Sequence, residues 1–177
     1  GRKVWVSSLN AAKGIDGMAK VYVSVGSNID REHNIASALT ALAREYGALE
    51  QSRIFETEAV GFSGDLFLNL VVGFETGQSP QQVSAVLRRI EDAHGRNRGG
   101  GKFSSRSLDL DLLLYDELIV DEPDLILPRP EILEYAFVLR PLAEIAADSR
   151  HPVSGQSYAA LWDRFDAASQ PMWPLEE

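Results

Sequence analysis

Residues 107–115 read SLDLDLLLY, and the fold can be worked out from this short stretch. Successive side chains in a β-strand point to opposite faces. The leucines at 108, 110 and 112 therefore share one face, and Asp109, Asp111 and Leu113 share the other. Because the run is otherwise so apolar, it predicts a central strand of a sheet.

Three further strands and two helices are predicted upstream. The strands are KVYVSV at 20–25, which stops at the turn GSN, then SRIFETEA at 52–59 and LFLNLVVGFET at 66–76. The first helix has apolar residues at helical spacing from Ile35 to Tyr46 and stops at Gly47. The second begins at Ser79-Pro80, a preferred N-cap followed by a preferred first residue, and ends at Gly95.

The resulting order, β-α-β-β-α-β, is typical of the ferredoxin-like α+β fold, an antiparallel sheet with two helices on one face. Two more helical stretches, near 137–146 and 158–165, are expected to cover the other face and to complete α/β/α layers. This fold serves enzymes, regulatory modules and RNA binders alike, so the function must be inferred from side chains.

Composition excludes several classes of protein. The 177 residues suit one domain, and the absence of cysteine excludes disulfide scaffolds, thiolate metal sites and a cysteine nucleophile. The three histidines lie far apart and show no metal-ligand spacing. A net charge of −9 argues against nucleic acid or an anionic membrane as a partner.

The N-terminal 17 residues lack the apolar run of a signal peptide. We interpret residues 1–17 as an extension or a remnant of cloning, Met18 as the native start, and residues 18–177 as a single domain. No apolar run approaches the roughly 20 residues that span a bilayer. We therefore expect a cytoplasmic monomer that acts on small molecules.

Asp109 and Asp111 are the first candidate site residues. Two carboxylates about 7 Å apart on one strand face can hold hard cations such as Mg²⁺. The alternative is an ordinary solvated strand face. However, aspartate is a poor strand former and is costly to bury unpaired, which favours a functional reason.

A basic segment precedes that strand. The segment from Arg88 to Arg106 contains six basic residues and only two acidic ones, and Gly99–Gly101 lies within it. Arginine binds phosphate oxygens through two parallel hydrogen bonds, so this loop beside a carboxylate pair predicts a polyphosphate–Mg²⁺ site. The glycines suggest a lid. The spacing matches neither a P-loop nor a dinucleotide-binding fingerprint, and a solvated helix end is the alternative.

Asn69 interrupts the apolar strand LFLNLVV. Its carboxamide offers a donor and an acceptor, which suits a heterocycle that presents both. Phe67 shares its face, and Phe103 and Phe137 are further candidates for stacking. An asparagine at a strand irregularity among core phenylalanines is the plainer explanation for each residue alone.

Together these residues resemble the 6-hydroxymethyl-7,8-dihydropterin pyrophosphokinases of folate biosynthesis. The resemblance runs from about Val21 to Phe165. It is carried by VSVGSN at 23–28, FLN at 67–69, IE at 90–91, GRNR at 95–98, RSLDLDLLLY at 106–115 and FVLRPLAEI at 137–145.

The resemblance implies transfer of pyrophosphate from ATP to the hydroxymethyl group of the pterin, with release of AMP. It implies that Asp109 and Asp111 bind two Mg²⁺ ions, and that Arg96, Arg98, Arg106 and Lys102 hold the ATP phosphates, with Arg96 and Arg106 also assigned to catalysis. It places Glu91 and Leu112 at the nucleotide. The pterin site implied in this way consists of Thr57, Val60, Phe67, Asn69, Phe103 and Phe137.

Lys102 stands where an arginine is usual in that family, and Phe67 and Phe103 stand where a tyrosine and a tryptophan are usual. Two further positions depart from its pattern. Arg129 stands where a histidine is usual, and we expect it to contact the phosphates of ATP. Tyr135 stands where an arginine is usual. A paralogue that acts on another hydroxymethyl pterin, a non-catalytic small-molecule sensor and, less well, an RNA-binding sheet remain as alternatives.

Overall fold

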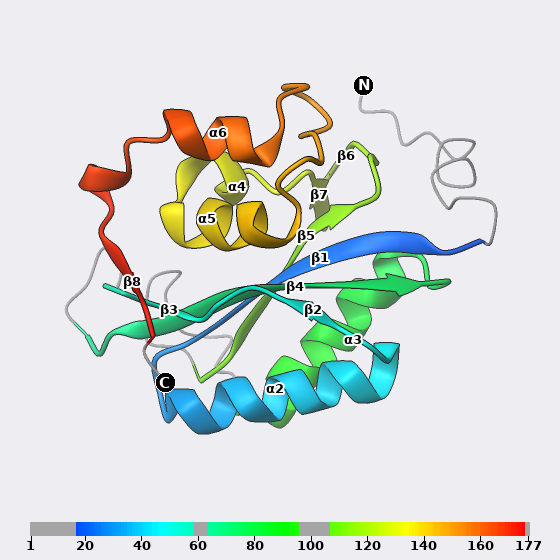
Figure 1. The fold of residues 1–177 in the computed structure, drawn as a ribbon. Helices are drawn as coiled ribbons and strands as arrows, with labels where there is room; N and C mark the ends of the chain where they lie inside the picture. The colour runs from blue at the N-terminus through cyan, green and yellow to red at the C-terminus, as the bar shows by residue number, and fades with distance from the viewer. Residues whose placement is uncertain (1–16, 59–63, 96–106, 176–177) are drawn as a thin grey trace.

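The computed structural model describes residues 17–58, 64–95 and 107–175. It has three layers, with an antiparallel sheet between two sets of helices (Figure 1). On one face lie α2 (Arg31–Tyr46) and α3 (Pro80–Ala93). On the other lie α4 (Glu131–Glu134), α5 (Ala136–Ile145) and α6 (Tyr158–Arg164). The face that α5 covers is called the α5 face below.

The main sheet has the strand order β5-β1-β4-β3-β8, and β2 pairs with β4 beside β3. These strands are β1 (Ala19–Ser27), β2 (Glu50–Gln51), β3 (Phe55–Thr57), β4 (Phe67–Thr76), β5 (Asp109–Tyr115) and β8 (Met172–Pro174). All pairs are antiparallel. A separate hairpin joins β6 (Val120–Glu122) to β7 (Leu125–Leu127), and η1 (Ala167–Ser169) precedes β8. The order β5-β1-β4-β3 confirms the predicted ferredoxin-like core.

Alternation along the strands divides the core in two. Val21, Val23 and Val25 pack with β4, β5 and the two long helices, whereas Tyr22 packs on the α5 face. In β5, Leu110 and Leu112 face α2 and α3, and Leu113 faces α5. The predicted division of the leucines and aspartates between two faces is therefore confirmed.

Two details differ from the sequence-based expectation. First, β5 lies at an edge of the sheet and not at its centre. Its apolar run arises because Leu112 and Leu113 are buried on opposite faces, between two helical layers. Burial of both faces makes an edge strand read like a central one.

Second, the strand predicted at 52–59 is divided. The Ser52 hydroxyl accepts the Val71 N–H at 2.9 Å, in place of a backbone carbonyl, and donates to the Arg53 carbonyl at 2.8 Å. Regular pairing stops there and resumes at Phe55. Both helices predicted for the second layer are present, and α4 is an additional short one.

The long helix α3 begins as the sequence predicted. The Ser79 hydroxyl accepts from the Gln82 N–H, and the Gln82 side chain accepts from the Ser79 N–H, which is a capping box. Within the three described ranges, no helix is long and apolar enough to cross a bilayer. Residues 1–16 lie outside the described ranges, so the proposed N-terminal extension remains a prediction.

Candidate functional site

One row of residues crosses the α5 face from strand to strand. Gly26 on β1 pairs with Asp109 on β5 and with Asn69 on β4, and Asn69 pairs with Phe55 on β3. Directly paired residues share a face. The row therefore joins a carboxylate, a carboxamide and an aromatic ring, which the sequence separates by up to 54 positions.

The glycine in this row is required by its neighbour. A Cβ on Gly26 would lie 2.8 Å from Oδ1 of Asn69, which is closer than real contacts allow. The bare backbone at Gly26 thus leaves room for the carboxamide above β1. A glycine inside a strand signals such a close approach, but local sequence indicated only the start of a turn at Gly26.

Asn69 is oriented by Thr57. Its Nδ2 donates to the Thr57 hydroxyl at 2.7 Å, and both side chains are buried. Thr57 in turn pairs with Phe67 across β3 and β4. The structure therefore brings together three of the residues that the resemblance assigned to the pterin.

Asp109 and Asp111 lie farther along the same face and are partly exposed. Ser24, which no local sequence pattern indicated, pairs with both Asp111 and Val71 on this face. Nη2 of Arg129 lies 3.3 Å from Oδ1 of Asp111, and Nε donates to Glu131 at 2.7 Å. Burial by itself would lower the pKa of the Arg129 guanidinium. The nearby carboxylates of Asp111, Glu131 and Asp109 have the larger combined effect, so the pKa is raised.

Glu91 and Leu112 lie at the edge strand. Oε2 of Glu91, buried at the end of α3, accepts the Leu110 N–H at 2.9 Å. The Leu112 side chain packs toward α2 and α3, away from the aspartates. In a strand, the N–H groups of residues two positions apart point in the same direction. The Leu112 N–H therefore points away from β1, as the Leu110 N–H does, while the Leu112 side chain lies in the core. Their assignment to the nucleotide remains a prediction.

Aromatic and cationic side chains from α5 and its N-cap lie on the same face of the sheet as this row. Tyr135 and Phe137 stack with ring centroids 5.1 Å apart. The guanidinium of Arg140 lies 4.7 Å from the centroid of the Phe55 ring. Phe55 and Arg140 were missed from the sequence. Alternation with Thr57 could have indicated Phe55, but nothing local indicated Arg140.

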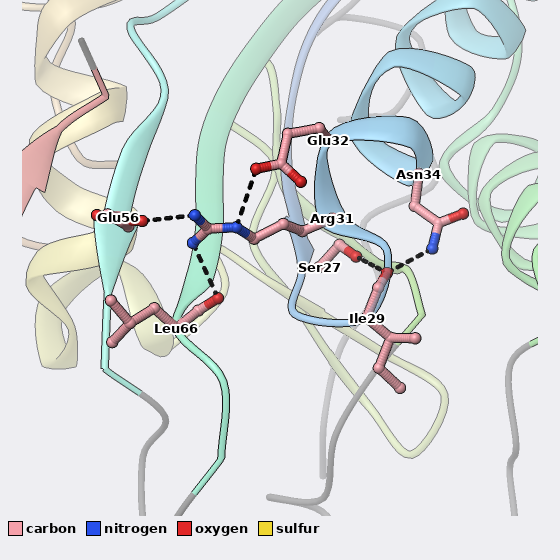
Figure 2. Close-up of polar contacts among 7 residues, drawn as sticks. All are labelled: Ser27, Ile29, Arg31, Glu32, Asn34, Glu56 and Leu66. Atoms are coloured by element: carbon pink, nitrogen blue, oxygen red, sulfur yellow. Dashed lines mark hydrogen bonds and ion pairs between the residues drawn. The ribbon is translucent and has the colours of Figure 1, made fainter.

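A second set of contacts holds the site strands from the α2 side (Figure 2). Arg31, in the first turn of α2, donates to Glu56 on β3 at 2.6 Å and to the Leu66 carbonyl, just before β4, at 3.2 Å. Its Nε also contacts Glu32. Arg31 therefore fastens both strands that carry Thr57 and Asn69.

The turn that presents Arg31 has its own hydrogen bonds. The Ile29 carbonyl accepts from the Ser27 hydroxyl at 3.0 Å and from Asn34 Nδ2 at 2.7 Å (Figure 2). Asn28 Nδ2 donates to the Asp65 carbonyl at 3.2 Å. The motif GSN at 26–28 thus organises the end of the sheet near Asn69.

Several predicted site residues lie outside the described ranges. They are Val60, Arg96, Arg98, Lys102, Phe103 and Arg106. Among the described residues, no group of three or more histidine, aspartate or glutamate side chains could hold a metal ion. A metal at Asp109 and Asp111 would therefore take its other ligands from groups besides the acidic and histidine side chains of the described ranges, and substrate and water are candidates.

Comparison with known proteins shows the family of this chain. Residues 22–147 match the family model described as 7,8-dihydro-6-hydroxymethylpterin-pyrophosphokinase (HPPK). A 2-amino-4-hydroxy-6-hydroxymethyldihydropteridine pyrophosphokinase from Porphyromonas gingivalis is 38% identical over 135 residues, covering 73% of this chain and 92% of its own. The Bacillus subtilis protein of the same name is 37% identical over 129 residues, covering 70% and 76%.

Larger proteins also match. The chain is 33% identical to the folic acid synthesis protein fol1 of Pneumocystis carinii over 88% of its length, but spans only 21% of that protein. Wild-type Plasmodium falciparum HPPK-DHPS, solved with pterin and p-hydroxybenzoate, aligns with a TM-score of 0.68 at 12% identity. That alignment covers 85% of this chain and 44% of the other, and it shows the fold alone.

Proposed function

The chain belongs to the family of 7,8-dihydro-6-hydroxymethylpterin pyrophosphokinases and transfers pyrophosphate from ATP to hydroxymethyldihydropterin in folate synthesis, and we propose that its α5 face holds both substrates. The row Asp109–Gly26–Asn69–Phe55 is the observation that carries this proposal. In this row Asp109 carries a carboxylate, which can bind a metal ion, and Asn69 carries a carboxamide, which can bind a heterocycle.

At the pterin end, Asn69 and Thr57 fix the position of the ring. Because Asn69 Nδ2 is engaged by Thr57, the carboxamide has a set orientation before a ligand arrives. Its Oδ1 lies over Gly26 and can accept from a ring N–H or an amino group. Phe67 and Phe137 supply aromatic faces, and Phe103 and Val60 are assigned to the same site by the resemblance.

At the nucleotide end, Asp109 and Asp111 suit two Mg²⁺ ions. They are partly exposed carboxylates on one face, and hard oxygen ligands are those that Mg²⁺ prefers. Bound Mg²⁺ would neutralise charge on the triphosphate. Arg129 lies beside both aspartates and adds positive charge, and Arg96, Arg98, Lys102 and Arg106 are proposed to hold the phosphates.

The reaction requires orientation more than side-chain acid–base chemistry. The hydroxymethyl oxygen attacks the β-phosphorus of ATP and its proton passes to solvent. The new oxygen–phosphorus bond forms, and the bond from the β-phosphorus to the oxygen that bridges it to the α-phosphorus breaks to release AMP. Asn69 and Thr57 orient the pterin, whereas Arg129 holds Asp111 in place. Alignment of the two reactants accounts for a large part of such rate accelerations.

An assay of AMP release from Mg-ATP, with and without 6-hydroxymethyl-7,8-dihydropterin, tests this proposal. Asp109→Asn and Asp111→Asn should each lower turnover at least about 100-fold while the protein stays folded. Asp163→Asn, an exposed position on α6, is the matched control. Normal turnover in both aspartate variants would refute the nucleotide end of the site.

The paralogue and the sensor considered from the sequence would give different results in the same assay. A paralogue would release AMP with another hydroxymethyl pterin and not with this one. A sensor would bind the pterin and release no AMP.

A separate experiment tests the metal assignment. Electron paramagnetic resonance measures the binding of Mn²⁺ to the parent protein and to Asp109→Asn.

A further inference from the structure

The last described segment of the chain joins two parts of the proposed pterin site. Residues 170–175, called the C-terminal strap below, run beside α4 and α5 and then along β3 (Figure 1). The family match ends at residue 147, so the strap lies beyond it. We propose that the strap positions the pterin site, with Gln170 as the positioning residue. This inference rests on the proposed function.

The first attachment is made by one side chain. Gln170 Oε1 accepts the Ala136 N–H at 2.9 Å, and its Nε2 donates to the Glu134 carbonyl at 3.0 Å. Between them lies Tyr135, whose extended backbone (φ −124°, ψ 128°) separates α4 from α5. Gln170 thus bridges this break by satisfying one group on each side of it.

The bridge also completes the start of α5. The first N–H groups of a helix have no partner within the helix, and a side chain at the N-cap normally satisfies one of them. The N-cap of α5 is Tyr135, which makes no such hydrogen bond. The side chain of Gln170, 34 residues away in the sequence, accepts the Ala136 N–H in place of an N-cap side chain. It thereby fixes the first turn of α5, which carries Phe137.

The second attachment is a strand pairing. β8 pairs with β3 in the register Phe55–Pro174, Glu56–Trp173 and Thr57–Met172. The Leu175 N–H also donates to the Ile54 carbonyl at 2.8 Å. β3 is only three residues long, and β8 supports the edge that β4 leaves open. The strap therefore holds the strand that presents Thr57 to Asn69.

The two attachments set the distance between opposite sides of one site. Phe137 projects from the segment that Gln170 bridges, and Thr57 lies on the strand that β8 supports. The aspartates lie on β5, at the far side of β1 from β3 in the sheet order. Loss of the strap should therefore weaken binding of the pterin and leave binding of the nucleotide intact.

The test compares two affinities in Gln170→Ala. The Kd of 6-hydroxymethyl-7,8-dihydropterin, measured by fluorescence with a non-hydrolysable ATP analogue and Mg²⁺ present, should rise about 5- to 30-fold for two lost hydrogen bonds. The Kd of the ATP analogue alone should stay within about twofold of the parent value. Gln156→Ala is the matched control, because within the described ranges the Gln156 side chain bonds only to the exposed Arg164.

A conservative variant separates positioning from general stability. Gln170→Glu retains an acceptor for the Ala136 N–H and adds negative charge near the start of α5, but a carboxylate cannot donate to the Glu134 carbonyl. It should therefore recover only part of the pterin affinity that Gln170→Ala loses. Truncation after Ser169, studied below its melting temperature, removes both attachments and should weaken pterin binding beyond the effect of Gln170→Ala.

Two results would overturn the proposal: an unchanged pterin Kd in both Gln170→Ala and the truncated chain, or an equal loss of pterin and nucleotide binding. Asn69→Ala distinguishes this failure from failure of the proposed function. If Asn69→Ala abolishes pterin binding while Gln170→Ala and the truncated chain both bind pterin normally, the site assignment stands and the role of the strap is refuted. If Asn69→Ala binds normally, the pterin site itself is misplaced and the strap proposal falls with it.

Discussion

Arg129 lies with Nη2 3.3 Å from Oδ1 of Asp111, although 18 residues separate the two in the chain. The main-chain N–H of Arg129 also donates to the Leu113 carbonyl at 3.0 Å, so the segment before α4 is fastened to β5. A permanent cation is thus held beside the two carboxylates proposed to bind Mg²⁺. The guanidinium is well placed to share in the recognition of a polyanionic substrate.

Replacement of Arg129 should impair the use of ATP. A charge-assisted hydrogen bond to phosphate contributes about 1.5–3 kcal/mol, so Arg129→Ala should lower kcat/KM for ATP roughly 10- to 150-fold. Steady-state kinetics of AMP release measure this effect. Arg164→Ala, at an exposed arginine on α6, should change nothing. An unaffected kcat/KM would mean that Arg129 serves only as a counter-ion of Asp111.

Tyr135 should not replace the arginine that is usual at its position. Its ring stacks on Phe137, and a phenol carries no positive charge at neutral pH. Tyr135→Phe should therefore retain activity within about twofold, whereas Tyr135→Arg should restore part of the loss caused by Arg129→Ala. A double-mutant cycle measures this recovery. Strictly additive effects would show that positions 129 and 135 do not share a ligand.

Gly26→Ala should disturb Asn69. The new Cβ would lie 2.8 Å from Oδ1 of Asn69, so the carboxamide must move from the position that Thr57 sets. We expect the pterin Kd to rise at least about tenfold, with a stability loss of about 1–3 kcal/mol from overpacking. Gly77→Ala is the control, because its Cβ would meet only Met18 Sδ at 3.9 Å. Titration by fluorescence that shows equal affinity in both variants would contradict the role of Gly26.

Arg31 and Glu56 should have a measurable coupling free energy in the stability of the protein. Both side chains are about a quarter exposed, at 23% and 28%, and their atoms lie 2.6 Å apart. Screening by solvent reduces the value of such a pair, so a cycle of Arg31→Met and Glu56→Gln should give a coupling of about 1 kcal/mol by urea denaturation. The more exposed pair of Arg89 and Glu45 should give about 0.5 kcal/mol or less. Equal couplings would argue against a special bracing role for Arg31.

His151 should make stability depend on pH. Burial lowers the pKa of His151 below its ordinary value of 6.5, and Nδ1 accepts the N–H groups of Val153 and Ser154. Below pH 6.5 the unfolded chain binds a proton that the folded chain excludes. The free energy of unfolding therefore falls as the pH drops from 6.5 to the lower folded pKa, and is flat beneath it.

His151→Gln should remove that fall, because glutamine can still accept a hydrogen bond and does not titrate. Thermal unfolding at pH 7.5 and pH 5.5 measures the change. His33→Gln, at an exposed position in α2, should leave the pH dependence as it is. A slope that survives in His151→Gln would assign the effect to another group.

The sequence alone determined which face residues 109 to 113 of β5 occupy, whereas a shift in the pairing with β1 breaks the alternation at Leu114 and Tyr115. The period of two is a property of the extended backbone, so the pattern LDLDLL is sufficient to place Asp109 and Asp111 together. Capping at Ser79 is equally local, since its partners lie within three residues. The order of strands and helices, and hence the ferredoxin-like core, also followed from local periodicity.

Tertiary structure decided what each site residue contacts. The edge position of β5, the interruption at Ser52 and the pairing of Arg129 with Asp111 all depend on segments that meet only after folding. The same is true of Gln170, whose side chain completes a helix that begins 34 residues earlier. Propensity and periodicity describe neighbours in the chain, whereas these contacts arise from packing between layers, which no local pattern encodes.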